Sequence, residues 1–159
     1  MLPLSFHHWL DELSANALRS VINFWPPFLG MGIKIETISE DFRRIDVKLT
    51  LHWYNKNYVG THFGGGMLAM TDPFYMLILL KNLGKNYIVW DKATQIDFKK
   101  VGKGILRAHF HLSEEQISSI RATADTQEKY IFDLPIDITN EAGEIVASVQ
   151  KTLYVRKKV

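Results

Sequence analysis

The sequence predicts an α+β fold in which a curled antiparallel sheet wraps around one buried helix. Residues 57–82 begin as a glycine-rich loop and continue as a segment that is apolar on nearly every side, which is typical of a buried helix. The segments around it alternate apolar and polar residues with a period of two, as strands do. Short turns join neighbouring segments, and this favours antiparallel pairing.

The composition is that of an ordinary globular protein. A chain of 159 residues with 47% hydrophobic and 23% charged residues fits a single domain, 1–159, with a sizeable core. The absence of cysteine excludes disulfides, thiolate nucleophiles and thiolate metal sites. A formal charge of +2 is too small to indicate a nucleic-acid partner. Without a signal-like start or an apolar run long enough to cross a membrane, we expect a soluble, cytoplasmic protein.

The chain begins with a predicted amphipathic helix and a predicted hairpin. Ser5 can cap a helix whose apolar residues recur at three- and four-residue spacing. Pro26-Pro27 cannot continue that helix. Residues 28–38 and 44–51 then alternate as two strands joined by a short turn.

Strands also follow the central helix, which Gly84 is predicted to end. In the strand predicted at 87–99, Lys92 shares a face with apolar residues, so we expect a lysine that points inward. A turn at 102–104 leads into a returning strand that ends near Leu112. One helix and two strands are predicted at the end of the chain: a helix from Ser113, which opens a capping box, to about Asp125, and strands near 130–139 and 145–155.

The start of the central helix predicts a site for a developing oxyanion, because N–H groups at a helix start lack partners and carry partial positive charge. Gly65 and Gly66 would supply these donors. Asp72 lies among apolar residues, where burial would raise the pKa of its carboxyl and suit it as a general base or nucleophile. An equally weighted alternative is that Asp72 caps a helix that begins at Pro73.

Other polar residues each have a structural alternative. His62 could orient water or simply make a structural hydrogen bond, and Asn57 and Thr61 could hold substrate or close turns. Lys92 could pair with Asp72 or form a salt bridge at a subunit interface. One group of lysines could meet phosphates or only form a solvated face: Lys99, Lys100 and Lys103. His109 and His111 have no acidic third ligand nearby in sequence, so no metal site is predicted.

The order of elements resembles the hotdog fold, a curled antiparallel sheet around one long helix. Four stretches resemble the bacterial branch known as a domain of unknown function or as tetrameric acyl-CoA thioesterases: residues 25–33, 57–65, 70–75 and 87–92. The resemblance covers almost the whole chain and includes the helical insertion at 113–125.

This resemblance implies an acyl-CoA thioesterase that acts as a homodimer or homotetramer, with active sites between subunits. Gly64-Gly65 and Asp72 match the spacing of the glycine pair and catalytic aspartate of phenylacetate-pathway thioesterases, although His62 lies one residue earlier than the usual histidine. Phe63 would join Gly64 in contacting the substrate. Coenzyme A enters only as part of the substrate, so no separate cofactor is implied.

Two rival functions stay open. A hydroxyacyl dehydratase would pair His62-Phe63 with a glutamate about one helical stretch downstream, but Met76 stands near that position, so this rival ranks below hydrolysis. A non-catalytic protein that binds acyl-CoA or an acyl carrier would keep the fold and lose turnover. The acyl group and the choice between coenzyme A and acyl carrier protein are not predicted.

Overall fold

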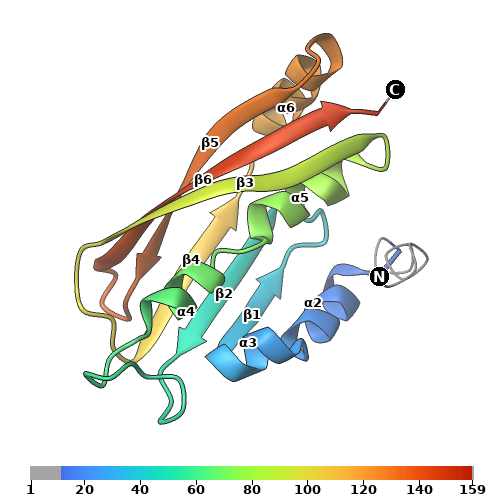
Figure 1. The fold of residues 1–159 in the computed structure, drawn as a ribbon. Coiled ribbons are helices and arrows are strands. Elements are labelled where there is room, and N and C mark those ends of the chain that lie inside the picture. Colours follow the sequence, from blue (N-terminus) through green and yellow to red (C-terminus); the bar gives the residue numbers. More distant parts are fainter. Residues whose placement is uncertain (1–11, 159) are drawn as a thin grey trace.

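Residues 12–158, which the computed structural model describes, form a six-stranded antiparallel sheet and five helices (Figure 1). The helices are α2 (Ala15–Asn23), α3 (Pro26–Met31), α4 (Gly64–Ala69), α5 (Phe74–Leu83) and α6 (Glu114–Thr126). The strands are β1 (Ile33–Ile38), β2 (Arg44–Thr50), β3 (Tyr87–Phe98), β4 (Ile105–His111), β5 (Tyr130–Thr139) and β6 (Ile145–Lys157). The strand order is β1-β2-β4-β5-β6-β3, and the α+β prediction is confirmed.

Helix α5 lies against the concave face of the sheet (Figure 1). Its side chains Phe74, Ile78 and Leu79 are fully buried. The rings of Phe74 and Tyr75 each lie 5.1 Å from the ring of Phe110 on β4. Burial of one such side chain contributes about 2 kcal/mol. The buried central helix is therefore the core element that the apolar segment predicts.

The central helix is broken rather than kinked. α4 ends at Ala69 and α5 begins at Phe74, with Asp72 and Pro73 in the break. Proline lacks an N–H group and disfavours a helical conformation at the residue before it, so one continuous helix cannot pass this point without loss of hydrogen bonds. The break leaves Asp72 at a turn between two helices.

The first strand does not begin at residue 28, as predicted. Residues Pro26–Met31 form the short helix α3, with proline at its first positions, where no N–H partner is needed. Gly32 ends it with a φ of 75°, and a Cβ there would lie 2.7 Å from the Thr50 carbonyl oxygen. Only glycine fits this close approach, so β1 begins at Ile33. The helix start predicted at Ser5 lies outside the described residues.

The strand pairing differs from the prediction that the strand after the turn at 102–104 returns along the strand before it. β3 pairs with β6, whereas β4 lies between β2 and β5. The segment after β4 agrees with prediction: Ser113 and Gln116 form both hydrogen bonds of a capping box at the start of α6. Arg121 of α6 then donates to the carbonyl oxygens of Asn82 and Leu83 and so ties α6 to the end of α5.

The two edge strands of the sheet differ in whether other groups bond to their outer backbone. Along β1, the Asn23 side chain of α2 exchanges two hydrogen bonds with the backbone of Ile35, at 2.7 and 3.0 Å. Arg19 donates to the Glu36 carbonyl oxygen at 3.0 Å. Along β3, no strand within residues 12–158 pairs with the outer edge. β3 therefore presents an open edge that can accept another strand.

Candidate functional site

His62 opens the glycine-rich segment and is only 3% exposed. Its Nε2 lies 2.9 Å from the Gly104 carbonyl oxygen, and its backbone N–H donates to the Gly102 carbonyl oxygen. Burial lowers the pKa of His62, against a smaller opposing effect of the Gly104 hydrogen bond. The ring is therefore a neutral link between this segment and the turn at 102–104, which favours the structural interpretation of His62.

Asn57 closes the turn before the segment. Its side-chain oxygen accepts from the N–H groups of Val59 and Thr61, at 3.1 and 3.0 Å. Its amide donates to the Thr61 hydroxyl and to the His62 carbonyl oxygen, at 2.9 and 3.2 Å. Both ends of the amide are occupied, so the turn-closing interpretation of Asn57 and Thr61 is favoured over substrate binding.

The three glycines of α4 differ in what their N–H groups do. Gly66 donates to the Phe63 carbonyl oxygen at 2.9 Å, so its predicted role as a free oxyanion donor is wrong. The N–H groups of Gly64 and Gly65 donate to no described residue. A Cβ on Gly64 would lie 3.0 Å from the Phe98 ring, and one on Gly65 would lie 2.3 Å from the Phe63 ring. Glycine here lets two aromatic rings approach the helix start.

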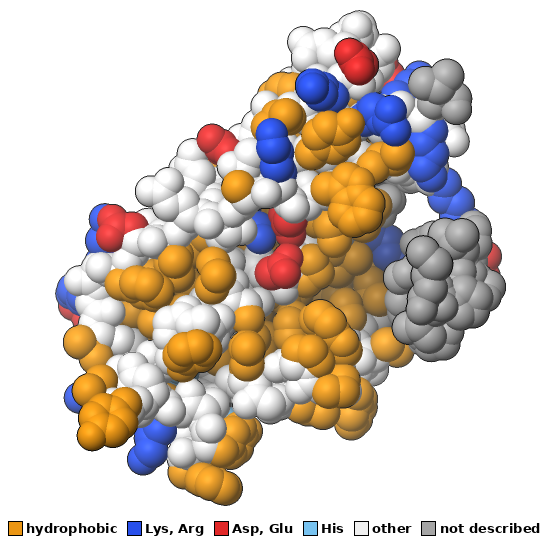
Figure 2. All heavy atoms as spheres, viewed as in Figure 1, with side chains coloured by type: hydrophobic (Ala, Val, Ile, Leu, Met, Phe, Trp, Pro, Cys, Tyr) orange, Lys and Arg blue, Asp and Glu red, His pale blue; other side chains and the backbone are white. Residues whose placement is uncertain are grey.

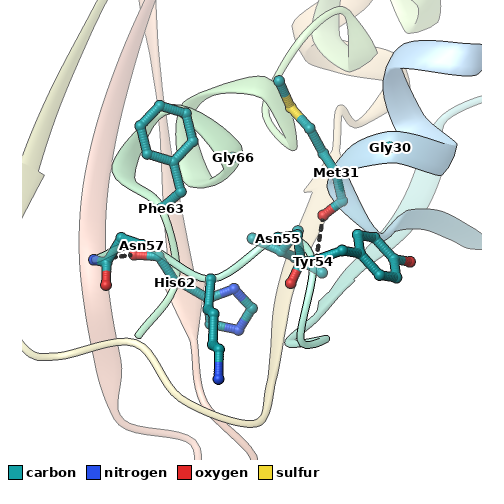
Figure 3. A pocket seen from close by; sticks show the side chains of 10 residues that line it. Gly30, Met31, Tyr54, Asn55, Asn57, His62, Phe63 and Gly66 are labelled. Atoms are coloured by element: carbon teal, nitrogen blue, oxygen red, sulfur yellow. Dashed lines mark hydrogen bonds between the residues drawn. The ribbon is translucent and has the colours of Figure 1, made fainter. Parts of the chain in front are cut away.

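A pocket of about 240 Å³ opens beside α4 (Figure 3). In Figure 3, Met31 and Tyr54 line one side of the pocket, and His62 and Phe63 line the other. The Asn55 amide donates a hydrogen bond to the Met31 carbonyl oxygen. The lining mixes apolar and polar groups, as ligand sites do. Asp72 does not line this pocket.

Asp72 lies in the break between α4 and α5. The residue before α5 is Pro73, and no side chain caps that helix, so Asp72 is not the helix cap. Its side chain is 61% exposed, which makes the predicted burial of Asp72 wrong for the single chain. Its Oδ1 lies 3.7 Å from Nζ of Lys151 on β6. The carboxylate thus has a cationic partner on one side and solvent on the other.

Lys151 has a second acidic neighbour, Asp91 of β3. The Lys151 side chain is 2% exposed, and its Nζ lies 3.3 Å from Oδ2 of Asp91, whose side chain is 17% exposed. Burial and the neighbouring Asp72 carboxyl raise the pKa of Asp91 to about 6, although the Lys151 ammonium opposes them. We call Asp72, Asp91 and Lys151 the carboxylate cluster.

The carboxylate cluster corrects the prediction for Lys92. β3 has a bulge between Asp91 and Ala93, and Trp90 on the same side as Lys92 is 62% exposed. Lys92 therefore faces outward, and the partner of Asp72 is Lys151. The signal for Lys151 was present in β6, where it alternates in phase with Val149 and Leu153. Asp91 alternates in phase with the buried Tyr87 and Val89, but the bulge that follows it changes the phase of the rest of β3 and hid this signal.

The predicted phosphate-binding lysines lie in the connection between β3 and β4. The same connection contains Gly102 and Gly104, whose carbonyl oxygens bond to His62 just before α4, so these lysines lie near the start of α4. Lys99 pairs with Asp97, and Lys100 pairs with Glu144 at 2.6 Å. Lys103 is exposed. No group of three or more metal-ligating side chains occurs within residues 12–158. None of the helices in that range is long and apolar enough to cross a membrane.

A curled antiparallel sheet around a helix with a glycine-rich start is the hotdog fold, as the comparisons with solved structures agree. The chain belongs to the family described as domain of unknown function DUF4442, whose model matches residues 15–155. No curated protein matches the sequence.

Three solved structures illustrate the fold likeness. PA5026 from Pseudomonas aeruginosa, described as a protein of unknown function and probable thioesterase, has a TM-score of 0.73 at 18% identity over 98% of this chain and 97% of its own. Thioesterase HI1161 from Haemophilus influenzae has 0.66 at 16%, over 91% and 92%. PaaI from the phenylacetic acid degradation operon of E. coli has 0.58 at 17%, over 99% and 96%. At these identities the likeness shows the fold alone.

Proposed function

We propose that this protein hydrolyses acyl-coenzyme A to a free acid and coenzyme A, with Asp72 as the general base. The observation that carries the proposal is the Asp72 carboxylate, open to solvent on one side and paired with the buried Lys151 ammonium on the other. The descriptions of PA5026 and HI1161 as thioesterases support the same class of reaction.

The reaction needs one base and one oxyanion donor. Water attacks the thioester carbonyl carbon while its proton moves to Asp72, and the carbonyl electron pair moves onto oxygen. The tetrahedral intermediate then collapses, the C–S bond breaks, and the sulfur leaves with its electron pair and takes the proton from Asp72. The N–H groups of Gly64 and Gly65 are the available donors for the oxyanion.

One chain alone does not aim both groups at one carbonyl. N–H groups at a helix start point away from its end, and Asp72 follows the end of α4. Two antiparallel copies, joined along the open edge of β3, would bring the glycines of one subunit toward Asp72 of the other. Hydrophobic side chains surround a small acidic patch on the face in Figure 2, which suits such a contact. We therefore include a homodimer, or a tetramer formed by two such dimers, in the proposal.

The rest of the substrate has candidate contacts near α4. The pocket of about 240 Å³ can receive a small acyl group or part of the pantetheine arm. The lysines at 99, 100 and 103 are the candidate partners of the coenzyme A phosphates. The pairs that Lys99 and Lys100 form at the surface are weak because solvent screens them, so phosphates can replace their carboxylate partners.

The test is thiol release from a panel of acyl-CoAs, short to long and including phenylacetyl and benzoyl, by the parent protein and its Asp72→Asn variant. We expect a preferred substrate and a loss of kcat/KM of about 100-fold or more in the variant, because a general base contributes at least that much. Asp137→Asn, the same substitution at an exposed aspartate whose described partner is the Ser148 hydroxyl, is the matched control and should keep the parent rate. Acyl-pantetheine, which lacks the nucleotide phosphates, should show a higher KM than acyl-CoA.

Two outcomes would reject the proposal. Equal activity in the parent and the Asp72→Asn variant would remove Asp72 from the reaction. No hydrolysis of any substrate by the folded parent, together with measurable acyl-CoA binding, would favour the non-catalytic binding protein. A dehydratase is not supported, because Nε2 of His62 is bonded to the Gly104 carbonyl oxygen and Met76 stands near the position of the required glutamate.

A further inference from the structure

Lys151 is a buried cation with two acidic neighbours. Within the described chain its ion pairs are with Asp91, at 3.3 Å, and with Asp72, at 3.7 Å. A buried charge is costly unless it is paired, so Lys151 requires one ionised carboxylate close by. One carboxylate is enough to pair with the ammonium, so the presence of both Asp72 and Asp91 brings two negative charges together.

The oxygens of Asp91 lack ordinary hydrogen-bond donors. Both are buried, and neither accepts a hydrogen bond in good geometry from a group in residues 12–158. Asp72 and Asp91 lie beside the same Lys151 Nζ, at 3.7 and 3.3 Å, and the neighbouring Asp72 carboxyl contributes to the raised pKa of Asp91. Two ionised carboxylates can only accept hydrogen bonds, whereas a protonated one can donate to the other. A single proton between the two residues would supply the missing donor.

We infer that Asp72 and Asp91 act as one proton-accepting unit, with the buried Lys151 ammonium as their common counter-ion. Asp72 is the end of the unit that is open to solvent and substrate. Asp91 lies beneath the surface and is a positioning residue, which shares with Asp72 the proton that the unit accepts. The part that this unit plays in hydrolysis rests on the function proposed above, whereas the shared proton itself does not.

The arrangement makes a stronger base than an isolated aspartate. An exposed aspartate has a pKa of about 3.9 and is a weak base at neutral pH. Repulsion between two adjacent carboxylates makes the pair bind its first proton more tightly, and such a pair titrates as a unit. The pKa of Asp91, raised to about 6 by burial and by Asp72, agrees with this. A base whose pKa lies near the working pH transfers protons more effectively.

The ionisable groups packed around the unit are few. Asp72 comes from the turn between α4 and α5, Asp91 from β3 and Lys151 from β6. Tyr75 of α5 donates its hydroxyl to the Pro135 carbonyl oxygen, and Lys92 of β3 faces the other side of the sheet. Asp72 and Lys151 are the charged groups that act on Asp91.

The first experiment is the pH dependence of kcat/KM, from pH 4.5 to 9, for the parent, Asp91→Asn and Lys151→Met. We expect the parent rate to rise with an apparent pKa near 6. Asp91→Asn should shift this limb down by about one unit or more and lower the plateau about tenfold. Lys151→Met should shift the limb up by about one unit or more, because the counter-ion is lost. A purely structural role would not move the limb in opposite directions, and an unmoved limb in both variants would overturn the inference.

The second experiment does not depend on turnover. Carboxyl ¹³C NMR titration of the parent should show one aspartate of the cluster titrating near pH 6. In Asp72→Asn, whose substituted side chain is exposed and should not disturb folding, that value should fall toward the ordinary range. Asp137→Asn should leave it unchanged. If both cluster aspartates titrate near 4 in the parent, no proton is shared and the inference is wrong, even where hydrolysis depends on Asp72.

Discussion

Lys92 and Lys151 lie on neighbouring strands and have opposite surroundings. Lys92 is exposed and lines an open groove on the outer face of the sheet with Trp90 and Tyr154. Lys151 is buried on the inner face and pairs with two carboxylates. Their side chains are chemically identical, so the difference comes from the face of the sheet alone. A cation acquires a chemical role where the protein excludes water around it and supplies acidic partners.

The largest effect that tests this comparison is expected from Lys151→Met at pH 8. Methionine fills a similar volume but leaves Asp72 and Asp91 without their counter-ion, and the loss of one partner of a buried ion pair costs about 4 kcal/mol. The cost should be smaller at pH 5, where Asp91 is already protonated. Urea unfolding at both pH values measures it. A variant as stable as the parent at pH 8 would contradict the importance of the buried ammonium.

The next largest effect concerns the pH dependence of stability. The folded pKa of Asp91 is about 6, above its ordinary value of 3.8, so protonation favours the folded state. This stabilisation is fully present below pH 3.8 and is lost as the pH rises through 6. Relative to the parent, Asp91→Asn should therefore gain about 2 kcal/mol of unfolding free energy between pH 4 and pH 8. The comparison with the parent cancels the other carboxylates, and a constant difference across this range would contradict the raised pKa.

An effect of similar size tests a different kind of buried group, the His62 ring, whose partner is a backbone carbonyl oxygen and not a charge. His62→Ala removes a ring that is 3% exposed and its hydrogen bond to Gly104, which should cost about 2 kcal/mol. The kcat of the folded variant should stay within about threefold of the parent, since His62 faces a carbonyl oxygen and not the carboxylate cluster. Thermal unfolding and thiol release measure the two quantities. A loss of kcat of about 100-fold in a folded variant would restore His62 as a catalytic residue.

Much of the fold could be predicted because its signals are local. Alternation in β2, β4 and β5, the capping box at Ser113 and the apolar segment of α5 each appear within a few residues of sequence. The partner of β3 and the position of β4 depend on contacts between distant segments, which short turns cannot determine. The helix α3 could have been predicted from Pro26-Pro27 followed by Gly32, the arrangement typical of a helix start and end.

The candidate site could be predicted only in part, for a related reason. Asp72 stood out because it interrupts an apolar segment, and Lys151 could have stood out because it interrupts the apolar face of β6. The bulge beyond Asp91 reverses which residues face inward: Val89 faces Val155, whereas Ile96, seven residues later, faces Val149 on the same inner side. Because of this one extra residue, Lys92 faces outward although alternation with Ile96 predicts that it faces inward. The amino-acid composition does not reveal such a bulge.

The smallest expected effect completes the comparison. Lys92→Met makes the same change as Lys151→Met but on the exposed outer face, where no described carboxylate pairs with the ammonium. The unfolding free energy should change by less than about 0.5 kcal/mol, as for ordinary surface positions. The acid limb of the pH profile should also stay where it is in the parent, because the sheet separates Lys92 from Asp72 and Asp91. A shift of that limb would mean that the outer face also sets the proton affinity of the cluster, and the contrast between the two lysines would then fail.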